Sequence, residues 1–107
     1  MRTKKTKMFT EAESEIYFCA FRYCLGRKSY VVSDFCDEAT RKIKLITDHF
    51  LLLLEKELTA AIVKDDEDRA KGECFKILGW DCDRACWEKF LKTVSAEIFR
   101  RKLERLK

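Results

Sequence analysis

The chain has no proline and only three glycines, Gly26, Gly72 and Gly79, among its 107 residues. Proline and glycine interrupt helices most strongly, because proline lacks a backbone donor and glycine carries a high entropic cost. Most of this sequence therefore contains nothing that would stop a helix once it has begun. The sequence predicts an all-α fold, with about five helices packed in a single compact domain.

The first predicted helix is marked by a capping box. In this motif the hydroxyl of Thr10 and the carboxylate of Glu13 each accept a hydrogen bond from a backbone amide that would otherwise lack a partner. The helix should therefore start at Glu11, with Ile16 on its apolar face. Gly26 can adopt the left-handed conformation that commonly ends a helix, so the helix is expected to stop there.

Two more hydroxyl residues are predicted to be N-caps of the helices that follow. Ser33 is expected to cap a second helix after a loop over residues 27–32, and Thr47 a third helix over residues 48–64. A short helix in the apolar segment 74–80, expected to end at Gly79, and a long amphipathic final helix complete the five.

Charge is distributed unevenly along the chain. The net charge is +4 overall, but residues 1–9 and residues 98–107 each carry a net charge of +4, so the residues between them carry −4. Residues 1–9 contain no acid and are predicted to form a basic flexible arm, followed by a helical domain over residues 10–107. An acidic body suits a basic partner better than it suits nucleic acid, whose readers usually carry a basic stripe across the folded surface.

The most acidic segment follows the third predicted helix. Four carboxylates are consecutive and a fifth follows closely: Asp65, Asp66, Glu67, Asp68 and Glu73. Like charges this close repel one another, which predicts an exposed loop. Such a surface is complementary to the basic groove of a nucleic-acid-handling protein, and charge complementarity both selects a partner and speeds association. These residues are the predicted partner-binding site.

The cysteines and the single histidine are the residues that could encode a metal site. Zinc prefers thiolate and imidazole ligands, and three thiolates with one imidazole form a closed, structural, tetrahedral site. The candidate zinc ligands are His49, Cys74, Cys82 and Cys86. The alternative is that these cysteines are small apolar core residues, as expected for Cys19, Cys24 and Cys36. The spacing lacks the paired-cysteine knuckle of zinc fingers, so the sequence leaves both alternatives open.

The sequence contains no signal for catalysis or for membrane insertion. It has no P-loop, no glycine-rich dinucleotide motif and no Cys-His signature around its only histidine, which predicts a non-enzymatic protein. The longest apolar run, residues 50–54, is far too short to cross a bilayer, and no apolar signal-peptide region follows the basic N-terminus. We therefore expect a cytoplasmic protein, in whose reducing environment disulfides are disfavoured.

One stretch of the sequence resembles a known group of proteins. The segment FRYCLGRKSYVVS over residues 21–33, followed downstream by Asp81, Cys82, Asp83 and Trp87, resembles small accessory proteins that phages and mobile elements of Gram-positive bacteria carry. In those proteins a similar Arg-Tyr-x-Leu-Gly-Arg core closes the first helix. Several small phage-borne proteins of this kind are anti-CRISPR inhibitors, so the resemblance implies a non-catalytic inhibitor.

Three functions are compatible with these features. The leading prediction is a phage or mobile-element inhibitor that binds a host CRISPR effector nuclease, or another basic nucleic-acid-handling protein, through the acidic surface and blocks its use of DNA. The alternative is a small DNA-binding transcriptional regulator whose basic N-terminal arm contacts phosphates. The third is a structural subunit that assembles through Ile98, Leu103 and Leu106 of the final helix.

Overall fold

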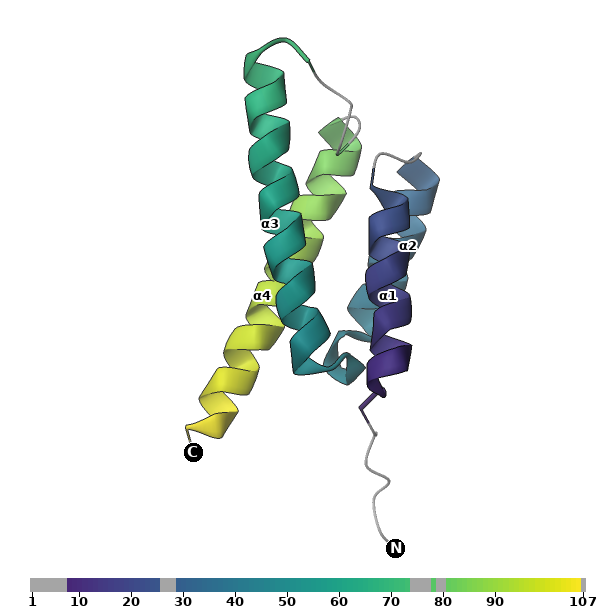
Figure 1. Ribbon diagram of the computed structural model, residues 1–107, viewed down its shortest axis with the longest axis vertical. Helices are drawn as coiled ribbons and strands as arrows, with labels where there is room; N and C mark the ends of the chain where they lie inside the picture. The colour runs from purple at the N-terminus through teal and green to yellow at the C-terminus, as the bar shows by residue number, and fades with distance from the viewer. Residues whose placement is uncertain (1–7, 26–28, 74–77, 79–80, 107) are drawn as a thin grey trace, which may run out of the picture.

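The computed structural model describes residues 8–25, 29–73, 78 and 81–106, and these residues are all-α (Figure 1). They form four α-helices and one short 3-10 helix: α1 (Glu11–Cys24), α2 (Ser29–Arg41), η1 (Ile43–Leu45), α3 (Asp48–Ala70) and α4 (Asp81–Arg105). The all-α prediction is confirmed, with four α-helices in place of about five. The predicted short helix over residues 74–80 lies outside the described residues, except for Leu78.

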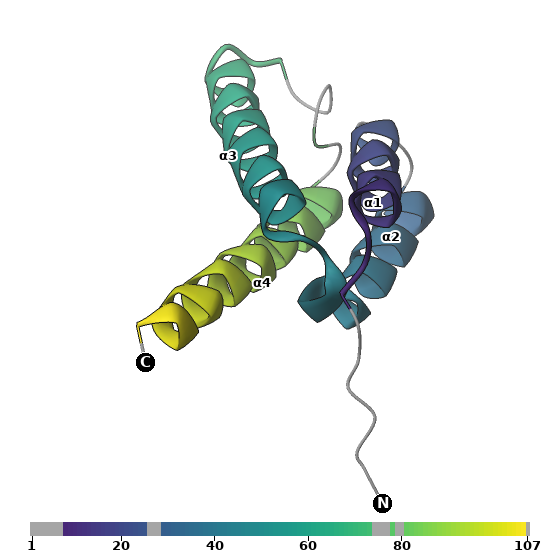
Figure 2. The same ribbon diagram turned by 60° about the horizontal axis from the view of Figure 1, so that its bottom comes forward.

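The helices pack as two pairs that share one core. α1 lies beside α2, and α3 crosses α4, as Figures 1 and 2 show from two directions. α4 contacts both α2 and α3, and α1 also contacts both α2 and α3. In both views the last turns of α4 extend away from the α1–α2 pair. No helix in the described part of the chain has the length and apolar character needed to cross a membrane.

An aromatic cluster around Trp87 forms the centre of the core. The Trp87 side chain is fully buried, and its ring centroid lies 5.5 Å from that of Phe21, 5.9 Å from that of Phe35 and 6.3 Å from that of Phe90. These rings come from α1, α2 and α4. Ring pairs in edge-to-face and offset arrangements add about 0.5–1.5 kcal/mol each beyond simple burial. One tryptophan of α4 therefore holds three helices together.

The capping box of α1 is present as predicted. The backbone N–H of Glu13 donates to Thr10 Oγ1 at 3.1 Å, and the backbone N–H of Thr10 donates to Glu13 Oε1 at 2.8 Å. The buried face differs from the prediction, because Ile16 is 65% exposed while Ser14 is fully buried. The Ser14 oxygen accepts a hydrogen bond from the backbone N–H of Thr47 at 3.0 Å, which explains why a polar residue lies inside.

α2 starts earlier than predicted. It begins at Ser29, so the expected loop is wrong over residues 29–32, and so is the expected N-cap at Ser33; residues 27 and 28 lie outside the described residues. Val32 is 1% exposed. Burial of its side chain is worth about 1.5–3 kcal/mol, which exceeds the roughly 0.5 kcal/mol that a β-branched residue costs in a helix. Packing against the core therefore outweighs the local preference for extended structure.

α3 is longer than predicted, because it continues to Ala70 instead of ending near residue 64. Thr47 stands at its N-cap position, but the hydroxyl makes no capping hydrogen bond, so the predicted capping role of that side chain is wrong. The additional helical turns contain the acidic segment that sequence analysis placed in an exposed loop. Their contacts with α4 explain the difference.

Candidate functional site

Two of the predicted partner-binding acids face the protein interior at the end of α3. Asp65 is 1% exposed and Asp68 is 6% exposed. Asp65 Oδ2 accepts hydrogen bonds from Arg69 Nε at 2.6 Å and from Arg84 Nη1 at 2.7 Å. Asp68 Oδ1 lies 3.1 Å from the ammonium nitrogen of Lys64. Buried carboxylates need such partners, because moving an unpaired charge out of water is very costly.

The prediction of an exposed acidic loop is therefore wrong. A helix places residues three apart on one face, so Asp65 and Asp68 turn inward together while their neighbours face solvent. Asp66, Glu67 and Glu73 are exposed, and Asp66 Oδ1 lies 2.9 Å from the guanidinium of Arg84. Cations of α3 and α4 thus neutralise much of the acidic charge within the molecule.

Two ion pairs fix the relative direction of α3 and α4. Asp48 in the first turn of α3 pairs with Arg101 near the end of α4 at 2.7 Å, and Asp65 near the end of α3 pairs with Arg84 near the start of α4 at 2.7 Å. The helices are therefore antiparallel. Residues 84 and 101 are about 25 Å apart along the axis, because a helix rises 1.5 Å per residue.

This arrangement separates the predicted zinc ligands. His49 lies in the first turn of α3, whereas Cys82 and Cys86 lie in the first two turns of α4, at the other end of the pair. A zinc ion holds its ligand atoms at about 2.0–2.3 Å, so these three residues do not share a site in this structure. Cys74 lies outside the described residues, which contain no cluster of three or more side chains able to hold a metal ion. The geometry gives the zinc prediction no support.

The structure brings Cys86 towards Cys36 instead. Both side chains line a groove of about 530 Å³ between α2 and α4. Burial raises the pKa of the Cys36 thiol to about 12, with further contributions from Cys86 and Cys24. Cys24 is also buried, and its Sγ donates to the carbonyl oxygen of Val31 at 3.9 Å. The core role predicted for Cys24 and Cys36 is confirmed, whereas Cys19 is exposed and the same prediction for it is wrong.

Thiol reactivity should follow this difference in burial. The thiolate is the reactive form, so a buried thiol with a pKa of about 12 reacts very slowly at neutral pH. In the folded protein we expect a maleimide to modify the exposed Cys19 and Cys82 rapidly and to leave Cys36 almost untouched. Timed labelling followed by peptide mass spectrometry measures this, with urea-unfolded protein as the control in which all three react alike. Rapid labelling of Cys36 in the folded chain would contradict its burial.

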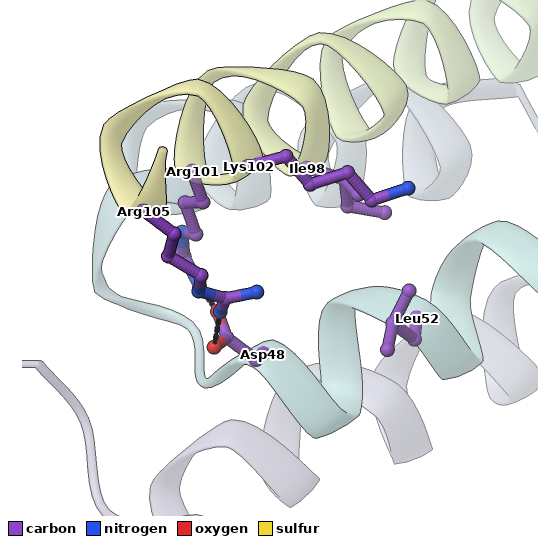
Figure 3. A pocket seen from close by; sticks show the side chains of 6 residues that line it. All are labelled: Asp48, Leu52, Ile98, Arg101, Lys102 and Arg105. Atoms are coloured by element: carbon purple, nitrogen blue, oxygen red, sulfur yellow. Dashed lines mark hydrogen bonds and ion pairs between the residues drawn. The ribbon is translucent and has the colours of Figure 1, made fainter. Parts of the chain in front are cut away.

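Arg101 is the centre of a network that ties α4 to the start of α3. It is 8% exposed, and its guanidinium donates to Glu97 at 2.8 Å and to Asp48 at 2.7 Å. It also donates to the backbone carbonyl oxygens of Ile43 at 3.3 Å and Lys44 at 3.1 Å. Figure 3 shows the side chain reaching from α4 towards Asp48.

The neighbouring arginines extend the network to the surface. Arg100 pairs with Glu97 at 2.6 Å and with Glu104 at 2.7 Å, and Arg105 pairs with Asp48. The hydrogen bonds from Arg100, and then those from the buried arginine beside it, hold the pKa of Glu97 below its ordinary value. Glu97 is therefore ionised at neutral pH and remains an ion-pair partner.

The start of the described chain lies beside this network. The backbone N–H of Phe9 donates to the carbonyl oxygen of Leu45 at 2.7 Å, and the Phe9 ring stacks on that of Tyr17 with centroids 5.6 Å apart. These contacts fix the chain at the base of α1. Met8 consequently lines the same hollow, of about 430 Å³, as Lys44 and the arginines of the last turns of α4.

We call this region the basic end of the molecule. Its described charged residues are five cations and three carboxylates, a net charge of +2: Lys44, Arg100, Arg101, Lys102, Arg105, Asp48, Glu97 and Glu104. Residues 1–7, which precede Met8 in the sequence, contain four cations and no acid. Sequence analysis treated the two basic termini as separate tails. Met8, Lys44 and the last arginines of α4 line one hollow only through tertiary structure, so no signal in the sequence could have revealed it.

Comparisons with protein families, curated proteins and solved structures found no match for the chain. The resemblance to phage-borne accessory proteins stays a prediction.

Proposed function

We propose that the protein binds nucleic acid and that its basic end contacts the backbone phosphates. The observation that carries this proposal is the position of Met8 in one hollow with Lys44 and the last arginines of α4. Met8 follows the basic segment 1–7 in the sequence, and here it shares a hollow with cations from near the other end of the chain. Lysine and arginine contacts to phosphates supply most of the sequence-independent affinity of proteins for nucleic acid. The proposal corresponds to the DNA-binding alternative, with the arm acting together with α4.

The cations of the basic end divide into two groups. Arg101 is buried and supports the fold, so it has little surface to offer a ligand. Lys44 and Lys102 are exposed and are the described cations best placed to reach phosphates. The cations of residues 1–7 extend the same charge along the chain.

The inhibitor function stays a prediction that rests on the resemblance to phage-borne proteins. Its expected acidic interface has lost its main support, because Asp65 and Asp68 are buried and Asp66 pairs with Arg84. The described residues as a whole carry a net charge of −4, so the case for an anionic polymer rests on the local charge of the basic end alone.

Fluorescence anisotropy with a labelled mixed-sequence duplex and its single strand tests the proposal. We expect the logarithm of the affinity to fall linearly with the logarithm of the salt concentration, by about 0.9 for each phosphate contacted on duplex DNA. Removal of residues 1–7 deletes four cations. If most of them contact phosphates, the salt dependence should become shallower, with the magnitude of the slope reduced by roughly 3. The double variant Lys44→Glu and Lys102→Glu should weaken binding at every salt concentration.

A matched control separates the basic end from net charge. The double variant Lys56→Glu and Lys71→Glu makes the same change in net charge at exposed positions elsewhere on α3 and at its C-cap. This control should retain most of the affinity. Equal losses in the two double variants, or no binding by the unaltered chain at low salt, would refute a phosphate site at the basic end.

A further inference from the structure

An exposed apolar stripe runs along the last turns of α4. Phe99 is 62% exposed, Leu103 is 47% exposed and Leu106 is 83% exposed, and Ala96 before them is also exposed. The spacing of these residues alternates between three and four, which is the a/d repeat of a coiled-coil seam. At 100° per residue the stripe lies opposite the buried face of the helix.

Of this surface, the sequence alone indicates Leu103 and Leu106. It predicted assembly through Ile98, Leu103 and Leu106, but Ile98 is partly buried against the core. Phe99 takes its place on the exposed side. Phe99 lies 100° further round the helix than Ile98, so this one position of the predicted seam faces the core, whereas Leu103 and Leu106 are exposed as the seam requires.

α1 carries a second exposed stripe with the same periodicity. Ile16 is 65% exposed and Tyr23 is 62% exposed, and Ala12 and Cys19 lie on the same exposed side. The spacing again alternates between four and three residues. This stripe lies opposite the buried face that contains Phe21.

The residues beside the two stripes carry opposite charges. Glu13 and Glu15 flank the first half of the α1 stripe, and Arg100 and Lys102 flank the α4 stripe. Arg22 lies beside the other end of the α1 stripe, where its guanidinium is 5.9 Å from the centroid of the Phe18 ring. Charges at flanking positions choose partners in helix pairs. Two α4 stripes would place cations against cations, whereas α4 against α1 places cations against carboxylates.

One molecule cannot join its own two stripes. The buried faces of α1 and α4 already meet, since the Phe21 and Trp87 rings lie 5.5 Å apart. The opposite faces therefore point away from each other. We propose that the α4 stripe of one copy docks on the α1 stripe of a second copy. The two surfaces differ, so the contact is heterologous and each copy keeps one free stripe at which the assembly can continue. This inference does not rest on nucleic-acid binding.

Sedimentation velocity of the purified chain without nucleic acid tests the inference. The unaltered chain should grow beyond a dimer as its concentration rises. Ile16→Glu and Phe99→Glu each place a charge in one seam and should weaken self-association about tenfold to a hundredfold. An equimolar mixture of the two variants should form a complex that stops at the dimer. In it, the intact α4 stripe of one variant meets the intact α1 stripe of the other.

Leu52→Glu is the matched control, because Leu52 is a 51% exposed leucine of α3 outside both stripes. It should assemble like the unaltered chain, and circular dichroism should show the same helical content in all variants. A chain that stays monomeric at every concentration overturns the inference. So does a mixture that stays monomeric, or strong self-association of Ile16→Glu alone, which would indicate contacts between two α4 stripes.

Discussion

Replacing Arg101 with methionine should lower the free energy of unfolding by about 3–5 kcal/mol, the usual cost of removing one partner from a buried ion pair. Methionine retains much of the apolar stem, so the loss reports mainly on the guanidinium. Without it, Asp48 loses one of its two arginines, and the carbonyl oxygens of Ile43 and Lys44 lose their donor. A domain of this size is stable by only about 5–15 kcal/mol, so urea denaturation will resolve the change.

Arg100→Met makes the same substitution one residue earlier and serves as the control. The Arg100 side chain is 42% exposed; its ion pair with Glu104 lies at the surface, whereas its other partner, Glu97, is buried. Surface ion pairs contribute little to stability, because solvent screens them and their side chains lose entropy. Glu97 keeps Arg101 as a partner in this variant, so the control should lose much less stability than Arg101→Met. Equal losses in the two variants would show that Arg101 is not the residue that ties α4 to η1.

The helices could be predicted because their signals are local. The hydroxyl of Thr10 and the carboxylate of Glu13 are one turn apart, and their capping box appears in the structure as expected. Local signals failed where a tertiary contact opposed them. Val31 and Val32 are β-branched residues that favour extended structure, yet they lie within α2, and the core buries Val32.

The candidate sites depended on contacts that are distant in sequence. The acidic segment was interpreted as a solvated loop because its partner Arg84 belongs to another helix. The zinc prediction assumed that His49 could approach Cys82, but the antiparallel course of α3 and α4 places them at opposite ends. The basic end was missed for the same reason, since Met8 and the last turns of α4 line one hollow only in the folded chain.

Asp65→Asn should lower the free energy of unfolding by about 3 kcal/mol, again because one charge is removed from a buried ion pair. The amide keeps the shape of the carboxylate but cannot neutralise Arg69 and Arg84, which both donate to Asp65. The last turns of α3 then lose their main polar contact with α4. Hydrogen exchange should show faster opening of these turns, and urea denaturation should give the overall loss. An unchanged exchange rate would contradict the tie between the helices.

Asp66→Asn is the matched control, because Asp66 is 61% exposed and its surface ion pair should contribute little. This variant should therefore unfold at nearly the same urea concentration as the unaltered chain.

The contrast between buried Asp65 and exposed Asp66 also decides which variants can test the inhibitor prediction. Reversal of Asp65 to lysine places a third cation beside two arginines and should prevent folding, so lost partner binding in that variant would report on unfolding. Glu67→Lys with Glu73→Lys changes exposed residues only and should leave the melting temperature nearly unchanged. Loss of binding to a basic protein in this variant would establish an acidic interface, whereas unchanged binding would exclude one.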